Sequence, residues 1–126
     1  MSQEVFIQRV SGQAQRRLLA QNRVDLTADV YLSVYTVSSG TESTIKSIYV
    51  CNRGTTGTLR LCHDENGTSY TEDNALFYDH TVTANSTLII NEEFYMLEGD
   101  SLGFSSGTAD IFTVSIYGEE IQSRAR

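Results

Sequence analysis

The stretch from Ala109 to Ile121 reads Ala-Asp-Ile-Phe-Thr-Val-Ser-Ile-Tyr-Gly-Glu-Glu-Ile. Phe112, Val114 and Ile116 fall on one side of a period-two alternation, and hydroxyl-bearing residues fall on the other. This alternation is typical of a β-strand with one buried side and one side facing solvent. Because such a strand is not stable alone, the rest of the chain must supply further strands to cover its apolar side.

From Ala28 onward, short segments rich in Val, Ile, Tyr and Thr alternate with turns of Gly, Asn and Ser. The predicted strands are 30–35, 44–51, 58–62, 75–80, 87–90, 102–104 and 109–121, with a short piece at 95–97. No long helical pattern interrupts them. The chain of 126 residues is therefore predicted to be all-β, an antiparallel β-sandwich of jelly-roll-like type with about seven or eight short strands.

The segment Asn52–Gly57 is predicted to be a hairpin loop, because Asn and Gly tolerate the positive φ of tight turns. In the strand that follows, Leu59 and Leu61 are expected to point inward and Cys62 outward. Cys51 and Cys62 are the only cysteines and flank this loop. Their pairing depends on where the turn falls, and two free thiols are favoured over a disulfide.

The net charge of −7 is distributed unevenly along the chain. Residues 1–24 carry +3, residues 25–121 carry −12, and residues 122–126 carry +2. This split predicts an N-terminal arm, a β-sandwich domain and a basic C-terminal tail, with the same boundaries. An acidic body does not favour binding to duplex nucleic acid, which requires a contiguous basic surface. No apolar run approaches the length of a membrane span.

The arm is expected to be extended or partly helical, since Gln13–Arg23 is rich in helix formers but has no long apolar stripe. We expect it to become ordered against a protein partner, with a solvated tail as the alternative. The residues expected to make this docking contact are Val5, Phe6, Ile7, Arg9, Arg16, Arg17, Leu18, Leu19 and Arg23.

The sequence offers no catalytic or metal-binding motif. His63, Asp64, Glu65, Asp73, Asp79 and His80 form the one cluster rich in metal-ligand types. They lack the spaced acids and central glycine of a calcium loop, so a solvated acidic loop is the favoured interpretation. The chain has no Gly-x-Ser-x-Gly segment and no residue placed to orient a base, so catalysis is not expected. We expect no cofactor.

Tyrosine is frequent and tryptophan is absent. Four tyrosines fall on predicted strands at positions assigned outward: Tyr31, Tyr35, Tyr49 and Tyr117. Outward tyrosines suit contacts between protein subunits, and flat aromatic faces also stack on sugar rings. Contact between subunits and glycan binding are therefore the two alternative roles for these four positions.

Several segments between Asp29 and Ile121 resemble a group of small β-rich proteins encoded by tailed bacteriophages. They are Val34-Tyr35-Thr36-Val37, Ser43 to Gly54, Thr58-Leu59-Arg60-Leu61, Leu76-Phe77-Tyr78-Asp79 and Val114 to Ile121. The most specific pieces are Val-Cys-Asn-Arg and the closing Gly-Glu-Glu-Ile. That group usually has a proline after the Tyr-Thr-Val segment, where Ser38 stands in this chain.

The resemblance implies a virion structural component without catalytic residues. A capsid decoration or cement subunit anchored by the basic arm is the first expectation, and a neck, collar, tail or baseplate accessory protein is the second. The expected partners are capsid or tail subunits and further copies of the chain, for which a trimer is one candidate. The expected location is the virion, assembled in the host cytoplasm. A carbohydrate-binding host-recognition module is the alternative from another class.

Overall fold

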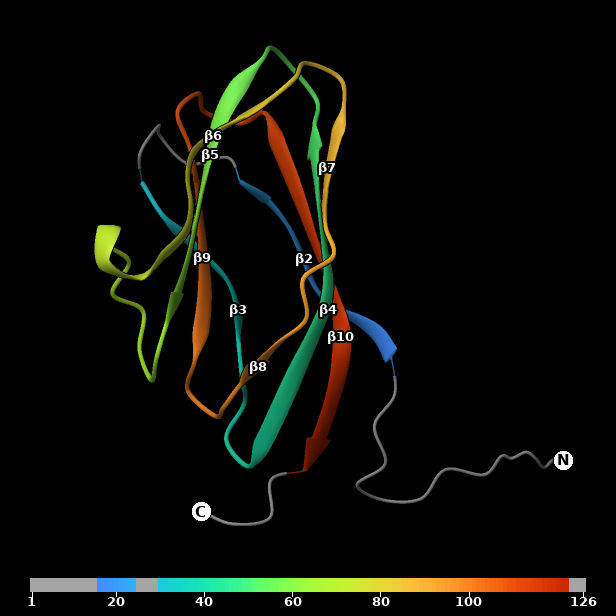
Figure 1. The fold of residues 1–126 in the computed structure, drawn as a ribbon, viewed down its shortest axis with the longest axis vertical. Coiled ribbons are helices and arrows are strands. Elements are labelled where there is room, and N and C mark those ends of the chain that lie inside the picture. Colours follow the sequence, from blue (N-terminus) through green and yellow to red (C-terminus); the bar gives the residue numbers. More distant parts are fainter. Residues whose placement is uncertain (1–15, 25–29, 123–126) are drawn as a thin grey trace, which may run out of the picture.

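The computed structural model describes residues 16–24 and 30–122. Within these ranges the chain forms nine strands and one short 3-10 helix (Figure 1). The elements are β2 (Arg16–Val24), β3 (Leu32–Thr36), β4 (Thr41–Asn52), β5 (Gly57–Asp64), η1 (Glu72–Asn74), β6 (Ala75–Val82), β7 (Thr87–Ile90), β8 (Phe94–Met96), β9 (Ser101–Ser106) and β10 (Phe112–Gln122). None of the described residues belongs to a helix long and apolar enough to cross a membrane.

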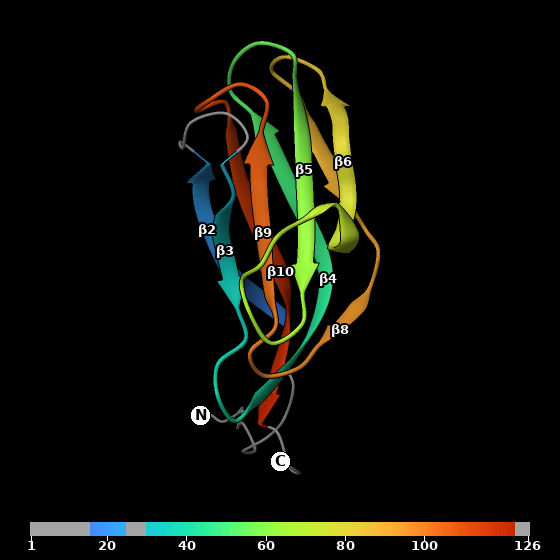
Figure 2. The same ribbon diagram turned by 90° about the vertical axis from the view of Figure 1, so that its left-hand side faces the viewer.

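The strands form two antiparallel sheets that face each other (Figure 2). The first sheet has the order β2-β10-β4-β7, with β8 also paired to β4, and the second has the order β3-β9-β5-β6. Most connections cross from one sheet to the other, so neighbours within a sheet are distant in sequence. This is the jelly-roll arrangement of a β-sandwich. The fold class predicted from the alternation and the turn spacing is confirmed.

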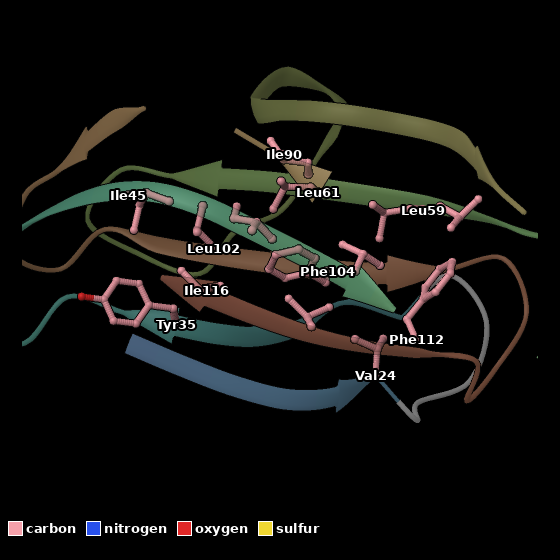
Figure 3. Close-up of a cluster of buried hydrophobic side chains, with 14 of the residues drawn as sticks. Val24, Tyr35, Ile45, Leu59, Leu61, Ile90, Leu102, Phe104, Phe112 and Ile116 are labelled. Carbon is pink, nitrogen blue, oxygen red and sulfur yellow. The ribbon is translucent and has the colours of Figure 1, made fainter. Parts of the chain in front are cut away.

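The core lies between the two sheets, where the apolar sides of the strands meet (Figure 3). Phe112, Val114 and Ile116 of β10 are fully buried there, as the period-two pattern predicted. Leu59 and Leu61 meet them from β5 in the opposite sheet and are also buried. Burial of these side chains removes a large apolar area from water and supplies the main driving force for folding.

The connection after β4 is not the predicted hairpin. β4 belongs to the first sheet and β5 to the second, so residues 53–56 carry the chain across the sandwich. The buried Asn52 amide organises the crossing: it donates to the carbonyl oxygens of Thr55 and Val82, at 2.8 and 3.0 Å, and accepts from the amide of Gly54 at 2.8 Å. Asn and Gly indicate a turn, but they do not decide which strand β4 pairs with.

The predicted division between an arm at residues 1–24 and a body from residue 25 also differs from the structure. Residues 16–24 form β2, an edge strand of the first sheet paired antiparallel with β10. The helix formers of this segment therefore adopt strand geometry, because pairing with β10 outweighs a weak local preference. The rest of the predicted arm, residues 1–15, and most of the predicted tail, residues 123–126, lie outside the described residues.

The loop from Glu65 to Thr71, followed by η1, lies over the outer face of the second sheet (Figure 2). The Tyr70 hydroxyl reaches the hydroxyls of Ser33 and Ser101, at 2.9 and 2.7 Å. Cys62 points away from the core as predicted, but this loop buries it, and its thiol lies 3.4 Å from the carbonyl oxygen of Thr71. Cys51 is exposed on the other sheet, and both thiols are free, which confirms that interpretation.

Candidate functional site

The outer face of the first sheet presents several exposed side chains to solvent. Its central row runs across four strands through Gln21, Ser115, Tyr49 and Ile89, which are opposite one another in register. Leu18, Tyr117 and Ser47 lie on one side of this row, and Thr113, Cys51 and Thr87 lie on the other. We call these ten residues the open face. These ten are uncharged and several are large, and Arg23 lies opposite Thr113 in the row that contains Cys51 and Thr87.

Large side chains of the open face are well exposed to solvent. The exposed fractions are 42% for Leu18, 39% for Tyr49 and 49% for Ile89. The rings of Tyr49 and Tyr117 meet edge to face, with centroids 5.6 Å apart and planes at 78°. Each ring fixes the orientation of the other. The two rings thus form a rigid apolar ridge rather than a coplanar platform.

Charged residues lie at the two ends of the open face. At one end the Asp110 carboxylate accepts from the guanidinium groups of Arg23 and Arg53, each at 3.0 Å. At the other end Glu119 and Glu42 lie together beside Thr44 and Tyr95. This arrangement of an uncharged centre between charged ends is typical of a protein contact surface.

The four tyrosines predicted to share an outward face do not do so. Tyr49 and Tyr117 lie on the open face, whereas Tyr31 is next to the second sheet and stacks against Tyr70, with ring centroids 5.6 Å apart. Tyr35 is buried at the edge of the core, with 6% of its surface exposed. Tyr35 points inward because the register of β3 against β9 shifts between Ser33 and Tyr35, which breaks the simple alternation.

The surroundings of these two displaced tyrosines change their acidity. Burial, together with the neighbouring Cys62 thiol, raises the pKa of Tyr31 to about 12. Burial also raises the pKa of Tyr35, and its hydrogen bond to the Glu120 carboxylate adds to that shift. Both hydroxyls therefore remain protonated at neutral pH and act as hydrogen-bond donors.

The residues predicted for the docking arm fall into two groups. Val5, Phe6, Ile7 and Arg9 lie outside the described residues. Arg16, Arg17, Leu18, Leu19 and Arg23 lie in β2, where Leu19 packs against the core and Leu18 joins the open face. Arg17 and Arg23 form ion pairs with β10 and with the turn before it.

The assignment of β2 to the body changes the charge of the remaining arm. Three of the four arginines counted in residues 1–24 belong to β2, so residues 1–15 retain Arg9 balanced by Glu4. The segment that precedes the sandwich is thus neutral overall, and its most distinctive feature is the apolar run Val5, Phe6 and Ile7.

The acidic cluster singled out in the sequence is built into turns and ion pairs. Asp64 accepts from the backbone amide of Ser69 at 2.9 Å and from the side-chain amide of Asn74 at 3.1 Å. Asp79 pairs with Arg60 at 2.7 Å, and that hydrogen bond lowers the pKa of its carboxyl. In residues 16–24 and 30–122, no three His, Cys, Asp or Glu side chains are placed to hold a metal ion.

An apolar groove of about 310 Å³ lies at the side of the sandwich, and no sequence pattern indicated it. It opens where the edge strand β6 of one sheet approaches β7 and β8 of the other, so its lining comes from four successive strands, two in each sheet. Phe77, Ile90 and Phe94 supply its apolar walls, and the rings of His63 and Phe94 lie 5.8 Å apart. Strand alternation cannot reveal such a groove, because it forms between sheets rather than within one strand.

No protein-family model matches this chain, and no curated protein matches it. A chain in the solved structure of infectious bursal disease virus, Gx strain, is similar to it in fold, with a TM-score of 0.51 and 11% sequence identity. The similarity covers 87% of this chain and 32% of the viral chain, so this protein spans about a third of the length of its structural neighbour.

The likeness concerns the β-fold and does not extend to individual residues, since the identity is too low to transfer any site. It covers most of the sandwich, so the match is not limited to a single hairpin or sheet. Shared architecture alone leaves function open, because one β-sandwich fold serves many activities. Any role must therefore be argued from the surfaces described above.

Proposed function

We propose that this protein is a non-enzymatic structural subunit of a bacteriophage virion, placed on the capsid as a decoration or cement subunit. The observation that carries the proposal is the jelly-roll strand order of the sandwich, a fold similar to that of a chain in a virus structure. Jelly rolls recur in viral capsid domains. The Val-Cys-Asn-Arg and Gly-Glu-Glu-Ile segments support a bacteriophage origin through the family they resemble.

We infer that residues 1–15 attach the subunit to its partners, which are capsid or tail proteins. This segment precedes an edge strand, so it can extend away from the sandwich without disturbing the core. Its net charge is zero, and its apolar run is Val5, Phe6 and Ile7. Attachment is therefore expected to depend on burial of apolar side chains and to weaken little as salt is added.

The test uses particles assembled without this chain, to which purified protein is added before the particles are sedimented. The full chain is expected to sediment with the particles, whereas a chain that begins at Arg16 is expected to remain in solution. That truncation retains β2 and its pairing with β10, so the body keeps its fold. Thermal unfolding of the truncated chain verifies this.

A matched pair of substitutions separates apolar contact from charge. Phe6→Asp removes an apolar side chain and adds one negative charge, whereas Gln8→Asp adds the same charge two residues away. We expect Phe6→Asp to reduce occupancy strongly and Gln8→Asp to have little effect. Failure of the full chain to bind any particle would contradict the virion role, and equal binding of the truncated chain would contradict only the attachment through residues 1–15.

A further inference from the structure

The two sides of the sandwich close differently. On one side the edge strands β2 and β3 lie against each other. On the other side β6 of the second sheet and β7 and β8 of the first leave the apolar groove between them. The buried side chains of Leu61 and Ile90 form the floor of this groove (Figure 3). A further apolar side chain that enters it is removed from water and extends the core.

The walls of the groove suit an aromatic side chain. Phe77 comes from the second sheet and Phe94 from the first, so a side chain that enters the groove meets a ring from each sheet. Aromatic rings pack favourably against one another, edge to face or offset. The volume of about 310 Å³ is at the lower end of the range for ligand pockets. The groove therefore accommodates one large side chain with its neighbours.

The rim of the groove is acidic. Glu92 and Glu93 are adjacent there, and Glu93 pairs with Lys46. Among the described residues, none forms an ion pair with Glu92. Its charge disfavours an anionic ligand such as a fatty acid and favours a cation next to the apolar group. The expected occupant thus combines an aromatic side chain with a nearby positive charge.

The chain carries this combination ahead of β2. Phe6 is the one aromatic residue of the sequence outside the described ranges, and Val5 and Ile7 flank it. Arg9 follows Phe6 by three positions, close enough for its long side chain to reach an acid at the rim of the groove. The segment matches the groove both in apolar character and in the sign of its charge.

The segment is long enough to reach the groove of its own chain. Arg16, where β2 begins, lies in the same register row as Tyr95 of β8, with β10 and β4 between them. Three strand spacings of about 4.8 Å separate the two positions by about 14 Å, and Phe94 of the groove is the neighbour of Tyr95. Because the sheets lie about 10 Å apart, the path across the first sheet and round its edge is about 24 Å. The ten residue steps from Phe6 to Arg16 span up to about 33 Å.

We propose that Phe6 docks in the groove of its own chain, with Arg9 beside Glu92. A segment joined to the body by so short a tether is present at an effective concentration on the order of 1 mM, far above that of other copies in dilute solution. The contact belongs to the free subunit, so it holds or fails independently of the virion role. Attachment to a particle through the same residues requires that Phe6 leave the groove.

Fluorescence of the full chain tests the docking, because the sequence contains no tryptophan. Phe6→Trp introduces a single indole, whose emission moves to shorter wavelength when water is excluded from it. We expect such a blue shift, and we expect Leu76→Lys to remove it by placing a charge at the groove. Ile89→Lys is the matched control, because Ile89 is 49% exposed, against 50% for Leu76, but lies on the open face. It should leave the emission unchanged.

The blue shift should not depend on protein concentration. A shift that grows with concentration would assign the groove to the segment of another copy and would overturn the intramolecular contact. Emission typical of exposed indole in the Phe6→Trp chain, or equal effects of Leu76→Lys and Ile89→Lys, would overturn the docking of Phe6 in this groove.

The contact between Arg9 and Glu92 is tested in the same Phe6→Trp chain. Arg9→Gln and Glu92→Gln should each lower the ratio of docked to undocked segment by a factor of about two to five, the range for an exposed ion pair. Added salt should have the same effect before either substitution and little effect after it. Because the two residues act as a pair, the double variant should resemble each single one. Fully additive effects would contradict the pairing.

Disulfide formation tests the docking with Phe6 in place. In a Cys51→Ser chain, Ile7→Cys is combined either with Leu76→Cys at the groove or with Ile89→Cys on the open face, which also lies within reach of the segment. Under mild oxidation the Leu76→Cys combination should lose its free thiols faster and remain monomeric on non-reducing gels. Phe6→Asp should remove the difference. Equal rates for the two combinations with Phe6 in place would mean that the segment has no preferred site and would overturn the proposal.

Discussion

The hydroxyl of Tyr35 donates a hydrogen bond to a carboxylate oxygen of Glu120 at 2.5 Å, and this contact joins β3 of the second sheet to β10 of the first. Ser43 of β4 lies 2.5 Å from the same hydroxyl, and Arg17 of β2 pairs with the same carboxylate. Tyr35 was expected on a subunit or glycan face and Arg17 on a docking arm. Both instead bind the carboxylate of Glu120 and stabilise the sandwich.

Removal of this hydroxyl should destabilise the fold. We expect Tyr35→Phe to lower the free energy of unfolding by about 1–2 kcal/mol, because the part-buried Glu120 loses a donor. Tyr49→Phe is the matched control, since that ring is exposed on the open face. Urea unfolding of both variants provides the measurement. Equal midpoints for the two variants would show that the hydroxyl of Tyr35 contributes nothing.

Stability should fall at alkaline pH. The pKa of Tyr31 is raised by burial to about 12, and that of Tyr35 is raised as well, whereas an unfolded tyrosine ionises near 10. The folded state therefore favours the protonated form of both residues. Their contribution is complete below pH of about 10 and is lost as the pH rises toward about 12.

Urea midpoints measured across this range test the prediction, together with the ultraviolet absorbance of tyrosinate. Tyr31→Phe should reduce the pH dependence. Ionisation of every tyrosine near pH 10 in the folded protein would contradict it.

The two thiols should react at very different rates. Cys51 is exposed on the first sheet, whereas Cys62 is buried beneath the loop that contains Thr71. A thiol-specific chromophoric reagent should therefore modify one cysteine per native chain quickly and the second only on unfolding. Cys51→Ser should abolish the fast phase, and Cys62→Ser should leave it unchanged. Two fast thiols in the native wild type would mean that the loop does not protect Cys62.

Gly118 of β10 should tolerate a side chain less well than Gly107. A Cβ at Gly118 would lie 2.2 Å from the backbone oxygen of Thr44, and backbone in a paired strand cannot move aside. We expect Gly118→Ala to cost about 3 kcal/mol of unfolding free energy. At Gly107 the nearest atom is the Thr58 hydroxyl, at the end of a side chain that can rotate. Gly107→Ala should therefore cost less, and the reverse order in thermal unfolding would contradict this account.

The sequence alone determined the fold class and most of the inward-facing residues. The alternation of Phe112, Val114 and Ile116 placed them in the core, and Leu59 and Leu61 followed the same rule. These predictions succeed because side-chain direction in a strand is a local property: successive residues point to opposite faces whichever strand lies alongside.

Only the tertiary structure decided which strands are neighbours, and with them the surfaces. Residues 16–24 became an edge strand and β4 paired away from β5, because strand pairing uses backbone groups that almost every residue has. The register shift that buries Tyr35 and the loop that covers Cys62 arise in the same way, from contacts between distant segments. The open face exists only once β2, β10, β4 and β7 lie side by side, since its residues come from both ends and the middle of the chain.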